Sequence, residues 1–196
     1  ALIKGEADIA VLPMISAANL YNKGIRYHLA GCPIWGTLYL AGKNEKNISS
    51  GNKAVLHIFG TGTTPDILTR HYLWQHKLDY TLNYSFTTAQ EIMQGILAGK
   101  IDHAVLGEPF LNIALRKDST LNILADLNRP DSASSGFAQT AILYAPTLEK
   151  NRKTIDSLLT LSCRFAVEQP ELAIQILEKE NIFVPGMLTP ESIKRC

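Results

Sequence analysis

Apolar residues recur along this chain with two different periods, and the two patterns alternate. Short apolar runs predict strands at residues 9–12, 25–30, 35–41, 54–59, 81–86, 103–106, 121–125 and 137–144. Apolar residues spaced three and four apart predict helices at 16–23, 65–77, 89–97, 111–116, 153–168, 170–179 and 190–195. This alternation is typical of an α/β protein with largely parallel sheets.

An internal repeat divides the chain. Residues 5–12 and 99–106 share the pattern G-x-x-D-x-A-V-L. Each copy predicts a helix that ends at a glycine, an aspartate that turns the chain, a buried parallel strand and a crossover helix. Two copies favour two similar lobes, although the same pattern is also common in α/β proteins in general.

Composition and charge exclude several classes of protein. The 196 residues are 46% apolar, which is enough for a sizeable core and argues against disorder. With 19 Lys+Arg against 18 Asp+Glu, the chain has no basic stripe for nucleic acid. It also has no apolar run of the roughly 18 to 20 residues that cross a bilayer.

The three cysteines, Cys32, Cys163 and Cys196, are far apart and form no C-x-x-C pair. We therefore predict free thiols, with neither a disulfide framework nor a zinc site. The sequence indicates no metal and no cofactor.

A glycine and threonine loop carries the clearest binding signal. In open α/β sheets, ligands bind beyond the carboxyl ends of parallel strands, and Gly60-Thr61-Gly62-Thr63-Thr64 follows such a strand. A helix starting at Pro65, capped by the preceding threonine, would direct its free N–H groups at the loop. We predict an anion cradle for sulfonate, carboxylate, phosphate or nitrate. The alternative is an ordinary strand-to-helix turn.

Other strand ends offer weaker candidates. Glu108 could accept a hydrogen bond from a ligand, or it could cap the next helix. Trp35 could line an apolar part of a ligand or pack in an interface. His57 and His103 lie in apolar strands and are predicted to be satisfied core histidines. Neither G-x-S-x-G nor H-E-x-x-H occurs in the sequence, so we predict no catalytic residue and no enzyme.

The order of these motifs resembles a known family. Gly5-x-x-Asp8-Ile9-Ala10 leading to Pro13, then residues 60–66, then Gly99-x-x-Asp102 leading to Glu108-Pro109, resemble the type 2 periplasmic binding proteins. The most similar group is the sulfonate, nitrate, taurine and thiamine-precursor (NMT1/THI5-like) solute receptors of ABC importers. Residues 144–146 and 169–171 extend the resemblance towards the C-terminus.

The resemblance implies a fold and a function. It implies a two-lobed α/β protein with residues 1–42 and 140–196 in one lobe and 43–139 in the other, lacking the family's first strand-helix-strand unit. It implies a periplasmic or extracellular monomer, with a lipid anchor as one form of attachment, that closes on a small solute and delivers it to a membrane permease. The ligand contacts that it implies are Pro13, Met14, Trp35, Thr61, Gly62, Thr63, Thr64 and Glu108.

Two alternatives share this fold. One is an enzyme related to the menaquinone or pyrimidine pathways, which would need a base such as His57 or His103. The other is the effector-binding domain of a LysR-type regulator, which would follow a DNA-binding segment.

Overall fold

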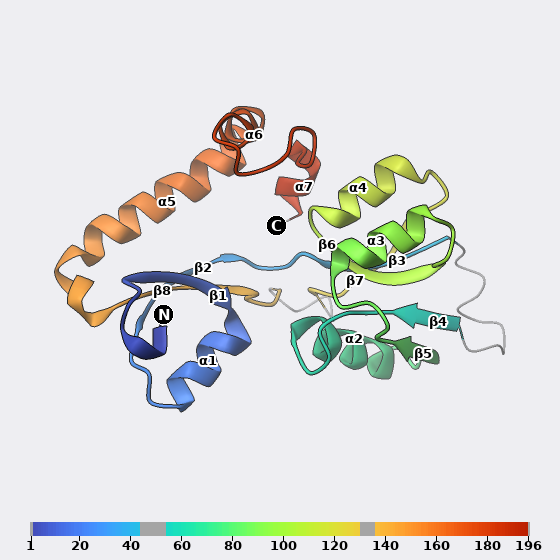
Figure 1. Cartoon of the computed structure of the whole chain (residues 1–196), viewed down its shortest axis with the longest axis horizontal. Helices are drawn as coiled ribbons and strands as arrows, with labels where there is room; N and C mark the ends of the chain where they lie inside the picture. Colours follow the sequence, from blue (N-terminus) through green and yellow to red (C-terminus); the bar gives the residue numbers. More distant parts are fainter. Residues whose placement is uncertain (1, 44–53, 130–135, 196) are drawn as a thin grey trace. The chain divides into compact units, whose positions relative to one another are not determined.

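The chain forms two compact units in a computed structural model that describes residues 2–43, 54–129 and 136–195 (Figure 1). Unit 1 comprises Ala1–Trp35 and Ala138–Ile182. Unit 2 comprises Gly36–Phe137 and Phe183–Cys196. Within the described ranges, no helix is both long and apolar enough to span a membrane.

Unit 2 contains a five-stranded mixed sheet in the order β5-β4-β6-β3-β7. Its strands are β3 (Leu38–Gly42), β4 (Ala54–His57), β5 (Tyr80–Asn83), β6 (His103–Gly107) and β7 (Asn122–Asp126). Strand β4 pairs in parallel with β5 and β6, whereas β3 is antiparallel to β6 and β7. The carboxyl ends of β4, β5 and β6 therefore lie at one edge of the sheet.

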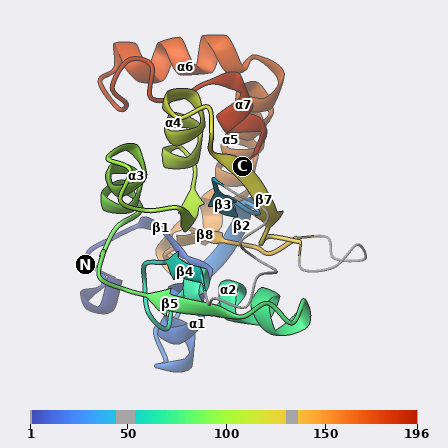
Figure 2. The same cartoon turned by 90° about the vertical axis from the view of Figure 1, so that its right-hand side faces the viewer.

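Helices cover both faces of this sheet (Figure 2). They are α2 (Thr64–Gln75) on one face and α3 (Ala89–Leu97) and α4 (Phe110–Lys117) on the other, with α7 (Pro190–Lys194) near the C-terminus. Val105 belongs to the same apolar cluster as Leu68 of α2, while Leu106 belongs to a second cluster with Ile96 of α3 and Leu111 of α4. Successive residues of β6 thus point to opposite helix layers.

Unit 1 is built around a three-stranded sheet in the order β1-β8-β2. Its elements are η1 (Leu2–Lys4), β1 (Ile9–Pro13), α1 (Met14–Asn22), β2 (His28–Ile34), β8 (Thr140–Tyr144), η3 (Pro146–Asn151), α5 (Arg152–Glu168) and α6 (Pro170–Lys179). Both pairings are antiparallel, so the prediction of largely parallel sheets is wrong for this unit. Strands β1 and β2 run in the same direction, but β8 lies between them and runs the opposite way.

The sheet of unit 1 is much less covered than that of unit 2. Ala17 of α1 packs with Ala141 and Leu143 on one face. On the other face Val11 pairs with Ile142, yet Val11 remains 63% exposed, and helix α5 contains no buried residue. The prediction of a buried strand at residues 9–12 is therefore wrong, because β1 is an edge strand whose second face has little cover.

The boundaries of the units differ from those expected. Strand β3 was expected with residues 1–42, but it pairs with β6 and β7 in unit 2. Residues 183–196 also belong to unit 2, since the side chain of Arg195 binds Glu108 and Asn112. The second division, between Phe137 and Ala138, lies close to the expected boundary between residues 139 and 140.

The internal repeat corresponds to one local structure that occurs in both units. Gly5 and Gly99 both adopt φ +69°, a left-handed conformation that favours glycine. The N–H of Gly5 donates to the carbonyl of Leu2, and that of Gly99 donates to the carbonyl of Ile96. Each glycine ends a helical turn and leads to a strand, β1 or β6, and then to a helix.

An acidic residue links the end of α4 to the end of β3. Asp118 accepts hydrogen bonds from the hydroxyl and N–H of Thr120 at 2.6 and 3.0 Å, and its Oδ2 lies 3.0 Å from Nζ of Lys43. The hydroxyl of Thr120, together with Lys43, lowers the pKa of Asp118 to about 2. The ionised carboxylate is therefore favoured by folding.

We expect Asp118→Asn to destabilise unit 2 in a pH-dependent way. Because the folded pKa lies below the unfolded one, the stabilisation is present above about pH 4 and is lost as pH falls towards 2. The free energy of unfolding should drop by about 1 kcal/mol at pH 6, allowing for solvent screening, and by much less at pH 3. Urea unfolding at the two pH values measures this, with exposed Asp102→Asn as the control. An equal loss at both pH values would contradict it.

Candidate functional site

Three polar segments follow the parallel strands of unit 2 at the same edge of its sheet. The loop Gly60–Thr64 comes after β4, Tyr84 comes directly after β5, and Glu108 comes directly after β6. The carboxyl edge of parallel strands is where open α/β sheets bind ligands. This edge therefore contains five of the eight ligand contacts that were predicted from the sequence.

The Gly60–Thr64 loop is a tight turn. Gly60 and Gly62 adopt φ +70° and +73°, and a Cβ at Gly60 would lie 2.4 Å from Oγ1 of Thr63. The N–H and the hydroxyl of Thr63 both donate to the carbonyl of Gly60, at 2.9 and 2.5 Å. Thr61 and Thr63 are exposed, whereas Thr64 is only 5% exposed. Of the three threonines, Thr61 and Thr63 are thus the two that a ligand in solvent could reach.

The helix after the loop begins one residue earlier than predicted. Thr64 is the first residue of α2 and Thr63 is its N-cap, but the Thr63 side chain makes no capping bond. The prediction that Thr64 caps the helix is therefore wrong, because Thr64 is already helical, and the hydroxyl of Thr63 at the cap position binds the carbonyl of Gly60 instead.

A buried carboxylate, which the sequence analysis did not identify, supports this loop. Oδ2 of Asp66 accepts the N–H of Gly62 at 2.8 Å, and Oδ1 accepts Nε of Arg70 and the hydroxyl of Tyr84, both at 2.6 Å. Burial alone would raise the pKa of Asp66, but the hydrogen bonds from Tyr84, Gly62 and Arg70 outweigh burial and lower it. The i,i+4 spacing of Asp66 and Arg70 was a signal for the ion pair, but nothing local indicated Tyr84.

Glu108 is already engaged within unit 2. Its side chain is 2% exposed and forms an ion pair with Nε of Arg195. Oε2 accepts the N–H of Asn112 at 3.2 Å, so the alternative that Glu108 caps the next helix is confirmed. The Glu108–Pro109 peptide bond is cis. A ligand contact at Glu108 stays a prediction, and such a ligand would meet a carboxylate that Arg195 already binds.

The remaining predicted residues lie at strand ends of unit 1. Pro13 ends β1 and Met14 begins α1, and the N–H of Met14 donates to the carbonyl of Gln139 at 2.9 Å. The N–H of Gln139 in turn donates to the carbonyl of Ile34 at 2.9 Å. Trp35 is 49% exposed, with its indole N–H bound to the carbonyl of Cys32. Gln139 thus joins the two predicted segments, and Trp35 offers mainly its ring face.

The two candidate histidines differ in their surroundings. His103 is 3% exposed in β6 and packs edge-on against Tyr80, so its position in the core is confirmed. Nδ1 of His57 is buried and has no partner among the described residues, and burial lowers the pKa of this histidine. The prediction of a satisfied histidine is therefore wrong for His57. No group of three or more metal-binding side chains occurs within the described ranges.

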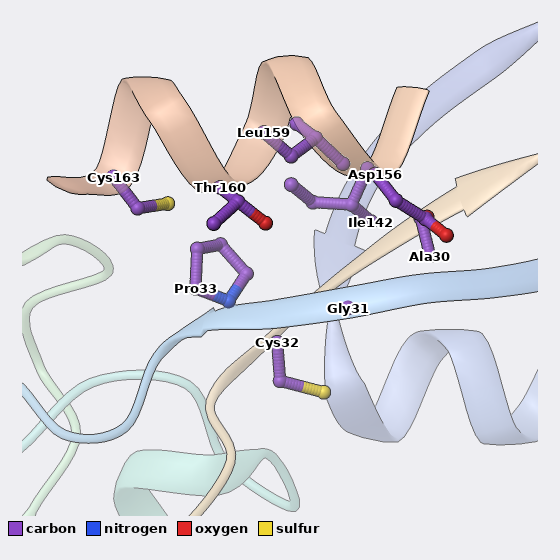
Figure 3. A pocket seen from close by; sticks show the side chains of 9 residues that line it. All are labelled: Ala30, Gly31, Cys32, Pro33, Ile142, Asp156, Leu159, Thr160 and Cys163. Carbon is purple, nitrogen blue, oxygen red and sulfur yellow. The ribbon is translucent and has the colours of Figure 1, made fainter. Parts of the chain in front are cut away.

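A pocket of about 560 Å³ lies in unit 1, between α5 and the sheet (Figure 3). Residues 30–33 of β2, Ile142 of β8 and four residues of α5 line it. Cys32 and Cys163 are among them, and both are free thiols as predicted, while Cys196 lies outside the described residues. The pocket contains none of the eight predicted ligand contacts. No residue of α5 is fully buried, so the side chains of this helix leave space above the sheet.

Solved structures show what the chain is similar to. The crystal structure of an ABC transporter from Parabacteroides distasonis is 60% identical, with a TM-score of 0.91, and the similarity covers 100% of this chain and 68% of that one. The periplasmic aliphatic sulphonate binding protein SsuA from Escherichia coli is 19% identical over 99% of this chain and 66% of its own, with a TM-score of 0.73. The alkanesulfonate-binding protein SsuA from Xanthomonas axonopodis pv. citri, bound to MOPS, is 16% identical over 100% and 67%, with a TM-score of 0.55.

These matches differ in what they establish. The two SsuA proteins are too distant in sequence to show more than a common fold. No family model and no curated protein matches the chain. The Parabacteroides protein is similar enough, over the whole of this chain, to show that the two proteins are related. Together with the fold, this similarity shows that the chain belongs to the type 2 periplasmic solute-binding proteins of ABC transporters.

Proposed function

We propose that this protein is the substrate-binding component of an ABC importer and that it captures a small anionic or heterocyclic solute. The observation that carries this proposal is the 60% identity to an ABC transporter protein over the whole chain. The sulfonate, nitrate, taurine and thiamine-precursor classes are the candidates, and the two SsuA neighbours support the sulfonate class first. The solute would pass to a membrane permease, and the protein would act in the periplasm or outside the cell as a monomer.

The loop of unit 2 is the principal proposed contact. The hydroxyl of Thr61 is exposed, whereas that of Thr63 is exposed but already donates to the carbonyl of Gly60. The first N–H groups of α2 have no acceptor within the helix. Hydroxyl and N–H donors suit the oxygen atoms of sulfonate, nitrate and carboxylate. Pro13, Met14 and Trp35 of unit 1 and Glu108 of unit 2 are the remaining proposed contacts.

An enzymatic role has less support than binding. It would require a base, and His103 is only 3% exposed within β6. The pKa of His57 is lowered, but its Nδ1 is buried and therefore not accessible to a solute from solvent. Solved structures similar to this chain include an ABC transporter protein and a periplasmic sulphonate binding protein, so we propose that this chain binds its solute without altering it.

Calorimetry should identify a solute from the proposed classes. We expect saturable one-to-one binding of at least one of taurine, methanesulfonate, nitrate and a hydroxymethyl pyrimidine to the full-length protein. Thermal unfolding with the same compounds provides a second readout, because a ligand that binds only the folded state raises Tm. A full-length, folded protein that binds none of these compounds would argue against the proposed solute classes.

Removal of the loop hydroxyls should weaken that binding. For Thr61→Val we expect a Kd about 3- to 10-fold higher, corresponding to the loss of one hydrogen bond to the solute. For Thr63→Val we expect a rise of similar size, because the loop loses the bond from Thr63 to the carbonyl of Gly60. Thr81→Val is the matched control, because Thr81 is an exposed threonine on β5 of the same unit. Unchanged affinity in both loop variants would exclude the loop as a contact.

A further inference from the structure

We propose that Asp66 is a positioning residue for solute capture, which holds the Gly60–Thr64 loop in the shape that presents the hydroxyl of Thr61 to the solute. This inference rests on the proposed function, since it assigns to Asp66 a role in the same binding loop. Asp66 itself lies beneath the loop, where it is 4% exposed, and we expect it to act through Gly62 rather than by touching the solute.

A single hydrogen bond connects the buried carboxylate to the tip of the loop. Oδ2 of Asp66 accepts the N–H of Gly62 at 2.8 Å. Gly60 and Gly62 both occupy left-handed conformations, and glycine has more alternative conformations to lose than any other residue. A loop with two glycines would sample several shapes unless something restrains it. The two bonds from Thr63 to the carbonyl of Gly60 close the turn, and the bond to Asp66 restrains Gly62 between them before the solute arrives. This restraint lowers the entropic cost of binding.

Two further donors fix the carboxylate itself. Nε of Arg70, from the next turn of α2, and the hydroxyl of Tyr84, from the segment after β5, both bind Oδ1 at 2.6 Å. Nη2 of Arg70 also donates to the Tyr84 hydroxyl at 2.7 Å, which closes a ring of three side chains. Because the donors come from a helix and from the segment that follows a strand, Oδ2 is held towards Gly62. The loop is thereby fixed to the framework of the sheet.

Exposure distinguishes this arrangement from an ordinary surface ion pair. The side chain of Asp66 is 6% exposed, whereas that of Arg70 is 58% exposed. An exposed pair of this spacing contributes little to stability. A buried carboxylate with a neutral hydroxyl and a backbone N–H among its donors is held far more firmly. We therefore assign the geometric role to Asp66 and Tyr84, with Arg70 as the counter-charge.

The test measures two quantities in each variant: the Kd for a solute, and the hydrogen exchange and chemical shift of the Gly62 amide. Taurine and methanesulfonate are the probes, and Asp66→Asn and Tyr84→Phe are the variants. We expect the Kd to rise about tenfold in Asp66→Asn, because the NH₂ group of the new side chain cannot accept a hydrogen bond from the donors that bind the carboxylate. In Tyr84→Phe, which keeps all charges and removes one of these donors, we expect a rise of about threefold. Asp102→Asn and Tyr72→Phe are matched controls from unit 2 and should leave Kd unchanged. Thermal unfolding of each variant shows whether it is folded.

NMR of the Gly62 amide provides a readout that needs no solute. In the unaltered protein this amide should exchange slowly, and its shift should titrate below pH 4, because the pKa of Asp66 is lowered. In Asp66→Asn the exchange should become fast and the titration should disappear. A Gly62 amide that Asp66→Asn leaves unchanged would overturn the inference.

The two proposals fail in different ways. If the unaltered protein binds a probe and both variants bind it equally well, the role of Asp66 is overturned while the proposed function stands. If the unaltered protein binds neither probe nor any other candidate solute, the proposed function fails and the positioning role fails with it, whatever the Gly62 amide shows.

Discussion

The burial of β6 on both faces constrains the rest of unit 2. All five residues of this strand, His103–Gly107, are buried. Its neighbours in the sheet, β3 and β4, lie between the same two layers of helices. A strand covered on both sides has no place for a solvated polar group except at its ends. Because β4 and β5 run parallel to β6, their polar ends are at the same edge. The location of Gly60–Thr64, Tyr84 and Glu108 is thus a consequence of core packing.

Two buried carboxylates at this edge change what an anion would meet there. Asp66 pairs with Arg70 and Glu108 pairs with Arg195, as a buried carboxylate must be paired to be tolerated. Asp66 also lies in the first turn of α2, where its charge offsets the partial positive charge of the helix. The edge is therefore close to neutral overall. Recognition of a solute by this loop would rest on hydroxyl and N–H hydrogen bonds more than on net charge.

Features set by neighbouring residues could be predicted from the sequence, whereas features set by distant pairing could not. The capping box of Thr88 and Glu91 and the glycine turn at residues 60–62 depend on a few adjacent residues, and both are present. The direction of β8 depends on its pairing with β1 and β2, which no local pattern encodes. The partner of Glu108 lies 87 positions away. The glycine and threonine loop could thus be located from the sequence, but the carboxylate network beneath it could not.

The repeated tripeptide Ala-Val-Leu shows most directly why local pattern does not determine burial. Val105 in β6 is 0% exposed, while Val11 in β1 is 63% exposed, although both follow the same G-x-x-D turn. The difference comes from the layers around each strand, since β6 is central in five strands and β1 is at the edge of three. Full burial of a valine contributes about 1.5 to 3 kcal/mol relative to exposure. Among the described residues, most of the buried apolar side chains accordingly lie in unit 2, the unit that contains the candidate loop.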